Sequence, residues 1–156
     1  MLAKNLRLKL SAAAVAAAVL AFSYANVFSA ANVIKINGTA AEIPPGMGEI
    51  RERDGRTFVP VRFVSEFLKN DVWFDDMTKA ACVSSAASLI YIQNGNNVLF
   101  VVSKLTGETR AVQMDTAAYI DADDNRTYLP IRFLAESLGY NVGWDEQTQT
   151  VSLDKL

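Results

Sequence analysis

An internal duplication constrains this chain more than any other feature of its sequence. Residues 54–83 align without a gap to residues 124–153 at an offset of 70, and 11 of the 30 aligned pairs are identical. Both copies contain the pattern Arg-Thr-Φ-Φ-Pro-Φ-Arg-Phe, where Φ is apolar, at 56–63 and 126–133. Two copies are too few for a solenoid, which needs about three repeats to bury a continuous core. We therefore expect a pseudo-symmetric pair.

Within each copy the residue pattern predicts a turn, a short strand, a helix and a hairpin. Residues 54–55 and 124–125 are types that tolerate positive φ and fit tight turns. Pro60 and Pro130 follow β-prone runs, and we expect each at the first helical position, where its missing N–H has no partner to lose. Apolar residues then recur at helical spacing before the period changes to two.

The ends of the predicted helices and hairpins differ between the copies. Gly139 stands where a glycine commonly ends a helix, and we expect Asn70 to take that role in the first copy. Asp75 and Asp145 begin the hairpin turns, because their carboxylates can accept bonds from nearby backbone N–H groups. The sequence thus predicts an α+β fold of two β-β-α-β-β pseudo-repeats, at 32–85 and 86–156.

A third hairpin is expected between the two motifs. Residues 89–92 and 98–102 are apolar at nearly every position and flank an Asn-Gly turn. Strands that are apolar on both faces are usually buried on both faces. We therefore expect this hairpin to lie between the copies and to join them into one folding unit.

The longer motif is Gly/Asn-Arg-Thr-Φ-Φ-Pro-Φ-Arg-Phe-Φ-x-Glu-x-Leu-Gly, then Val-x-Trp-Asp-x-x-Thr-x-Thr-Val. It resembles the copper amine oxidase N-terminal-like domain, also called the stalk domain. Residues 125–151 fit almost throughout, whereas the first copy departs at Lys69, at Phe74 and at residues 80–81. With its flanking strands, the resemblance covers most of residues 32–156. It implies antiparallel sheet curled around a helix in each copy, and a non-catalytic role in a secreted or wall-associated bacterial protein.

Residues 1–31 are typical of a secretory signal peptide. Three basic residues, Lys4, Arg7 and Lys9, precede an apolar run of 13 residues at 10–22, and small residues follow. A transmembrane anchor is the alternative, but it requires about 20 apolar residues. We expect cleavage after Ala31, or else after Ala25. The mature chain is then secreted, extracellular or cell-wall associated, with no membrane contact.

Composition excludes several classes of function. Cleavage leaves 12 basic and 17 acidic residues, a net charge of −5, and no basic patch is apparent, so nucleic acid is not an expected partner. The chain has no histidine and one cysteine, which removes His-based triads and the usual copper and zinc ligands. Residues 121–125 imitate a calcium loop, but Arg126 and Arg132 occupy the positions of the required Gly and Glu. We expect no metal and no cofactor.

Paired charges on each predicted helix have two interpretations. Arg62 with Glu66, and Arg132 with Glu136, are spaced i,i+4. They could form a duplicated binding site for anions or acidic sugars, or they could be structural ion pairs. The arginines could instead reach the turn carboxylates of Asp75 and Asp145. We favour the structural interpretation, with Trp144 as a further part of the motif.

Trp73 and Cys82 form the candidate binding surface. Copy two sets the phase of the hairpin, since Val151 reads as inward and Ser152 as outward. Transferred to copy one, this phase points Cys82 outward, and Trp73 opposite it also points outward. Exposed aromatic side chains often mark binding surfaces. Burial of the free cysteine is the competing expectation.

These observations favour a non-catalytic secreted module that mediates binding or attachment at the bacterial cell envelope. The expected partner is an envelope protein or a cell-wall polysaccharide. One alternative is a small secreted enzyme such as a carboxylate-pair glycosidase, which would need two acids facing each other across a cleft. Another is a secreted inhibitor or ligand sensor, for which residues 40–50 are the only candidate loop.

Overall fold

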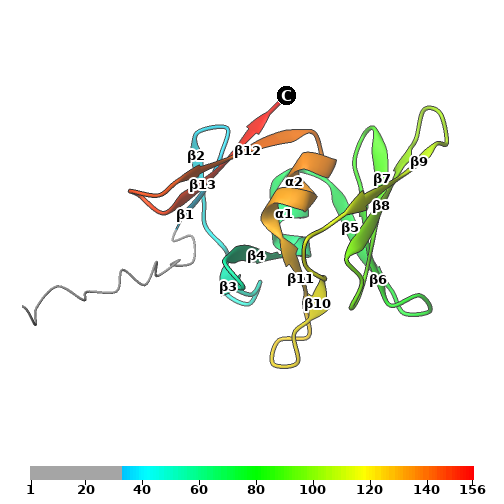
Figure 1. The fold of residues 1–156 in the computed structure, drawn as a ribbon, viewed down its shortest axis with the longest axis horizontal. Coiled ribbons are helices and arrows are strands. Elements are labelled where there is room, and N and C mark those ends of the chain that lie inside the picture. Colours follow the sequence, from blue (N-terminus) through cyan, green and yellow to red (C-terminus); the bar gives the residue numbers. More distant parts are fainter. Residues whose placement is uncertain (1–32) are drawn as a thin grey trace, which may run out of the picture.

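The computed structural model describes residues 33–156, so the predicted signal peptide lies outside the described residues. This part of the chain has two helices and thirteen strands, and the α+β class is confirmed (Figure 1). The helices are α1 (Val61–Phe67) and α2 (Ile131–Ser137). The strands are β1 (Val33–Ile36), β2 (Thr39–Ala41), β3 (Arg51–Arg53), β4 (Arg56–Pro60), β5 (Asp71–Asp75), β6 (Ala80–Ser84), β7 (Ser88–Gln93), β8 (Val98–Ser103), β9 (Thr109–Gln113), β10 (Tyr119–Ile120), β11 (Thr127–Pro130), β12 (Tyr140–Asp145) and β13 (Thr150–Lys155).

The two copies meet at the centre of the molecule, in a sheet of order β10-β11-β4-β3. Strand β4 pairs antiparallel with β11, and Val59 lies opposite Leu129, its own duplicate. The flanking pairs, Pro60 with Tyr128 and Phe58 with Pro130, exchange under the offset of 70. This is the isologous contact of a two-fold dimer, formed within one chain. Both helices follow directly from these strands and lie against them.

Each of the outer two sheets combines strands from both predicted pseudo-repeats. One has the order β12-β13-β1-β2 and the other β5-β6-β7-β8-β9, and they lie on opposite sides of the helices (Figure 1). Strand β1 pairs parallel with β13, and β6 pairs with β7. The predicted pseudo-repeat arrangement, with an antiparallel sheet curled around a helix in each copy, is therefore not confirmed in this detail. The hairpins β5–β6 and β12–β13 each have one edge strand that is left unpaired within the hairpin. A strand from the other sequence half, β7 or β1, pairs with that edge and satisfies its backbone hydrogen bonds.

A single core joins the helices to the inner faces of the outer sheets. Val59 and Leu129 belong to it, as do Ile34 of β1, Ile90 of β7 and Leu153 of β13. Because residues from both sequence halves fill this core, each half buries its apolar side chains only when the other half is folded against it.

The third hairpin is buried on one face only, which corrects the prediction of two-sided burial. Ile90 and Leu99 are fully buried, but Tyr91 is 36% and Phe100 42% exposed. Strands β7 and β8 extend the β5–β6 hairpin sideways rather than lying between the copies. Their inner face therefore meets the core, while their outer face carries aromatic rings to the surface.

Three of the four helix ends differ by one residue from the predictions. Pro60 and Pro130 end their strands and cap the helices, so each precedes the first helical position. Gly139 ends α2 with a φ of +82°, as expected. In copy one the left-handed position is Lys69, with a φ of +61°, and not Asn70. The duplication thus kept the backbone conformation at a position where copy one lacks glycine.

The face of the central sheet away from the helices carries an aromatic cluster. The rings of Tyr119 and Tyr128 stack with centroids 5.4 Å apart, and Phe58 lies 5.4 Å from Tyr119. The guanidinium of Arg51 lies 4.8 Å from the centre of the Tyr128 ring. The Tyr128 hydroxyl donates to Asp124 Oδ2 at 2.6 Å.

The acidic turn at 121–125 is occupied by protein groups. Asp121 Oδ1 accepts the backbone N–H groups of Asp123 and Asp124, and its other oxygen pairs with Arg51. Burial opposes ionisation of Asp121, but these hydrogen bonds and Arg51 outweigh it and lower the pKa of the carboxyl. The carboxylate that imitates a calcium ligand therefore stabilises the turn.

Candidate functional site

An aromatic row crosses the outer face of the five-stranded sheet. Directly paired residues on successive strands share one face. The register places the following residues side by side across β5 to β9: Trp73, Cys82, Tyr91, Phe100 and Ala111. We call these five residues the outer row. Trp73 is 43% exposed, close to the values for Tyr91 and Phe100.

Cys82 shares this face but is not accessible. Its side chain is 1% exposed, which corrects the prediction that it contributes to an exposed surface. Trp73 and Tyr91 flank it in register on the two neighbouring strands. Burial, with the charge of Asp75 adding, raises the pKa of the thiol. The register places Cys82 in line with Trp73 and Tyr91, and its side chain is buried there.

The sequence named Trp73 as a candidate but not Tyr91 or Phe100, which lie in the same row. Tyr91 in β7 and Phe100 in β8 each lie between two buried aliphatic residues, so these strands alternate between buried and exposed side chains. Leu89 and Val98 on the same face obscured that alternation, since they are also apolar. A large aromatic residue at alternate positions of a hairpin was the signal that could have identified this face.

The rows beside the outer row are mixed in character. They hold partly buried Leu89 and Val102, and the uncharged hydrogen-bonding side chains Gln93, Thr109 and Gln113. The acidic residues of this face lie on β5, at its Trp73 end. The outer row itself contains no charged residue.

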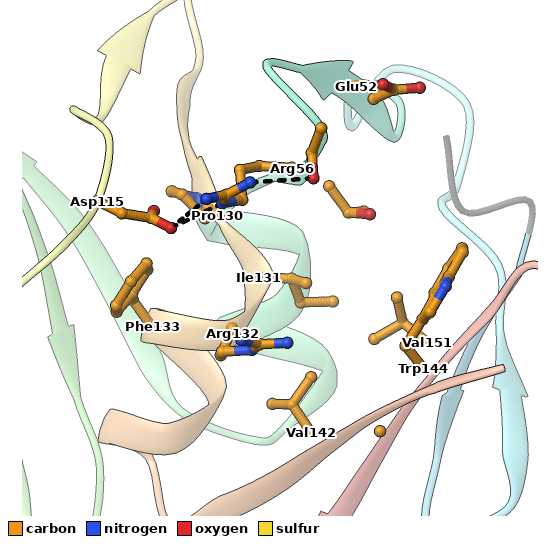
Figure 2. A pocket seen from close by; sticks show the side chains of 13 residues that line it. Glu52, Arg56, Asp115, Pro130, Ile131, Arg132, Phe133, Val142, Trp144 and Val151 are labelled. Carbon is orange, nitrogen blue, oxygen red and sulfur yellow. Dashed lines mark hydrogen bonds and ion pairs between the residues drawn. The ribbon is translucent and has the colours of Figure 1, made fainter. Parts of the chain in front are cut away.

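A pocket of about 420 Å³ lies on the other half of the molecule, beside α2 (Figure 2). Its lining residues are Glu52, Gly55, Arg56, Thr57, Asp115, Pro130, Ile131, Arg132, Phe133, Val142, Gly143, Trp144 and Val151. We call it the Arg132 pocket. In Figure 2, Arg132 extends from α2 between Ile131 and Val142 toward the open space, with Trp144 on the far wall.

Arg132 and its duplicate Arg62 behave differently. Arg62 Nη1 lies 3.4 Å from Glu66 Oε1, which is the predicted structural ion pair. Within residues 33–156, Arg132 makes no hydrogen bond or ion pair, so the predicted pair with Glu136 is not formed. The charge of Arg132 is therefore available to a ligand.

The turn carboxylates serve their own hairpins. Asp75 accepts the Thr78 hydroxyl at 2.7 Å and the Met77 backbone N–H at 3.0 Å. Asp145 accepts the backbone N–H groups of Gln147 and Thr148. Hydrogen bonds from the threonine side chains, together with those from the backbone, lower the pKa of both carboxyls. Neither carboxylate is bonded to the arginine of its helix. Both carboxylates instead accept hydrogen bonds within their own hairpin turns.

Trp144 lines the pocket instead of the core. It is 46% exposed near the tip of the β12–β13 hairpin. The interpretation of Trp144 as part of a structural motif is therefore incomplete, because almost half of the side chain faces solvent.

The family model for the copper amine oxidase N-terminal domain matches residues 35–153. The chain belongs to this family. The match begins in β1 and ends in β13, so it covers both sequence copies and the strands they share. No curated protein and no solved structure matches the chain. The family confirms the resemblance, and the copper amine oxidase N-terminal domain is a non-catalytic module.

Copper does not fit the residues of this copper amine oxidase N-terminal domain. Protein copper sites use imidazole and thiolate ligands. The chain has no histidine, and its one thiol is buried. Residues 33–156 contain no group of three or more Cys, Asp or Glu side chains arranged to hold a metal ion. In the same range, no helix is long and apolar enough to cross a membrane.

Proposed function

We propose that this chain is a secreted, non-catalytic module that attaches to a cell-wall polysaccharide through the outer row. The observation that carries the proposal is the exposure of Trp73, Tyr91 and Phe100 in one uncharged line across a sheet. Folding does not require half-exposed rings in such a line, and exposed aromatic patches mark binding surfaces. The sequence 1–31 supports secretion, and the family supports a module without catalysis.

The chemistry of the face favours a polysaccharide over a protein. A sugar ring presents C–H groups on its flat faces, which pack against aromatic rings, and hydroxyls at its edge. Neighbouring strands are about 4.8 Å apart, so Trp73 and Phe100, three strands apart, span about 14 Å. That length suits several linked sugar rings. Gln93 and Gln113 stand beside the row, and because their amide nitrogens already donate to backbone carbonyls, their amide oxygens are the groups offered to sugar hydroxyls.

The test is binding of the folded chain to purified, protein-free cell-wall glycan, measured by sedimentation. We expect saturable binding, and we expect the double substitution Tyr91→Ala and Phe100→Ala to weaken it by about tenfold or more. Phe74→Ala is the matched control, since Phe74 is 36% exposed on the same strand as Trp73 but faces the other way.

Two outcomes would overturn the polysaccharide assignment. The first is equal binding by the double variant and the unaltered chain. The second is binding to whole envelope that trypsin treatment of the envelope abolishes, which would indicate a protein partner.

Secretion has its own test. N-terminal sequencing of exported protein should begin at Asn32, or at Asn26 if the earlier bond is cut. Recovery of the uncleaved chain in membranes would contradict this part of the proposal.

A further inference from the structure

We propose that the Arg132 pocket binds a sugar that carries a single carboxylate. The pocket lies between α2, β4 and the β12–β13 hairpin, and none of the outer-row residues lines it. The inference therefore stands independently of the proposed function. Its volume of about 420 Å³ is within the range of small-ligand pockets, which is about 300–1,000 Å³.

The first step is the charge that the pocket offers. Two arginines line it, and Arg56 is already held by Asp115, with Nε at 2.7 Å and Nη2 at 2.6 Å from Oδ2. Arg132 has no such partner within residues 33–156. A guanidinium presents planar N–H donors that match the two oxygens of a carboxylate. Arg132 is therefore the group that would bind an anion.

The second step is the shape and polarity around that cation. Trp144 forms a half-exposed aromatic wall opposite Arg132, and Ile131 and Val142 supply apolar surface beside it (Figure 2). A ligand must then combine an anionic group with a flat face that packs on an indole ring. An acidic sugar has both features on one ring.

The third step limits the number of negative charges on the ligand. Glu52 also lines the pocket, so a second anionic group would meet a like charge there, whereas Asp115 is already paired with Arg56. The same carboxylates can accept hydrogen bonds from hydroxyl groups. One carboxylate among several hydroxyls satisfies both conditions, whereas a phosphate with two charges does not.

The duplication supplies an internal control for this site. Arg62 occupies the same position in α1, but its guanidinium is already paired with Glu66. The counterpart of Trp144 in copy one is Phe74, on a hairpin that lacks the indole at this position. The ligand site is thus expected on one copy only.

The experiment is calorimetric titration of the folded chain with methyl β-glucuronide, using neutral methyl β-glucoside and inorganic phosphate as comparison ligands. The two glycosides differ only in the carboxylate. We expect binding of the glucuronide only, weakened by added salt because part of the attraction is between exposed charges. Arg132→Ala should reduce the affinity by about tenfold or more. Arg132→Lys should retain part of it, and Arg62→Ala and Trp73→Ala should leave it unchanged.

The proposal is overturned if the glucuronide does not bind, if the glucoside binds equally well, or if Arg132→Ala binds like the unaltered chain. Stronger binding of phosphate would also overturn it. Arg132 is exposed, and a thermal unfolding midpoint like that of Arg62→Ala would show that the variant is folded. Trp144→Ala provides a second variant, which should weaken glucuronide binding while Phe74→Ala does not.

Discussion

The hairpins β5–β6 and β12–β13 are duplicates with the same strand pairing, but the residues on their outer faces differ in size and polarity. Asp75 pairs with Ala80 as Asp145 pairs with Thr150. Two residues along, Trp73 faces Cys82 in one hairpin, and Gly143 faces Ser152 in the other. The added strands continue the contrast, because Tyr91 and Phe100 extend the first row, and Lys35 and Ala40 the second.

The difference teaches which positions the fold requires. The turn aspartates are retained, and Lys79 and Gln149, at equivalent positions, both have positive φ. Those positions determine the backbone path. The outer rows do not contribute to that path, so they were free to diverge after the duplication. Substitutions at matched positions that set the backbone path should therefore change the free energy of unfolding equally in the two copies. Substitutions at matched positions on the outer faces should have different effects in the two copies.

The largest effect is expected from separating the copies. A fragment of residues 33–84 keeps β4 and β6 but loses their partners β11 and β7, and it leaves β1 without β13. It also loses half of the shared core. We expect no cooperative thermal unfolding by circular dichroism, in contrast to the full chain. A fragment with a sharp transition would show that the copies fold independently.

The second effect concerns Tyr128, whose duplicate Phe58 has no hydroxyl. Tyr128→Phe leaves Asp124 Oδ2 without the hydroxyl that donates to it, and we expect the free energy of unfolding to fall by about 1–3 kcal/mol in urea titrations. The pH dependence gives a second readout. Burial, followed by the bond to Asp124, raises the pKa of Tyr128 to about 12.

Because this pKa is raised, the stabilisation is present below the ordinary tyrosine pKa of 10.0 and is lost as the pH rises to about 12. Tyr128→Phe should remove that alkaline loss. An unchanged free energy of unfolding, with the same alkaline profile, would show that the hydroxyl contributes nothing.

A smaller effect is expected where the helices end. Gly139 has a φ of +82°, and no atom lies within 4 Å of the place that a Cβ would take, so Gly139→Ala costs only the left-handed conformation, about 1 kcal/mol. Lys69 already adopts that conformation with a side chain, at a φ of +61°. Lys69→Gly should therefore stabilise the protein by up to about 1 kcal/mol. Effects of the same sign for both substitutions, measured by urea titration, would contradict the equivalence of these positions.

How far sequence predicted this structure depended on whether the signal was local. The turn aspartates, the helix end at Gly139 and the direction of Trp73 follow from short patterns, and the structure agrees with them. Pairing β1 with β13 depends on an unsatisfied edge formed by residues more than a hundred positions away. No local period encodes that choice.

The candidate sites were predictable to a lesser degree. Burial of Cys82 depends on Tyr91, whose position beside it required the β6–β7 register. The isolation of Arg132 depends on a side-chain geometry that differs from Arg62 despite identical i,i+4 spacing. Both are outcomes of tertiary contacts, which a sequence motif shared by the two copies cannot distinguish.

A further matched pair is the turn aspartates. The pKa of each carboxyl is lowered, for Asp75 mainly by the Thr78 hydroxyl, so the folded state favours ionisation. The stabilisation is present above the ordinary carboxyl pKa of 3.8 and is lost as the pH falls through the lowered values. Asp75→Asn and Asp145→Asn should each reduce the acid dependence of the free energy of unfolding, to a similar extent. A reduction in only one variant would show that the two turns are not equivalent.

The smallest expected change in stability is at the outer row, where accessibility is the sharper measurement. Cys82 is 1% exposed and is flanked in register by Trp73 and Tyr91, and burial raises the pKa of its thiol. Reaction of the native protein with a thiol reagent should therefore be much slower than reaction of the denatured chain. Trp73→Ala should accelerate it, because one flanking ring is gone.

The same variant should change the free energy of unfolding by about 1 kcal/mol or less, since Trp73 is 43% exposed. Emptying a core aromatic site costs about 3–5 kcal/mol, so a loss of that size would mean that Trp73 serves the core and not the surface. Phe74→Ala, on the opposite face of β5, should leave the thiol reaction slow. Fast labelling of the unaltered protein would contradict the burial of Cys82. If labelling is slow and only Trp73→Ala accelerates it, the Trp73 ring lies on the outer face, at the position that Gly143 occupies in the second copy.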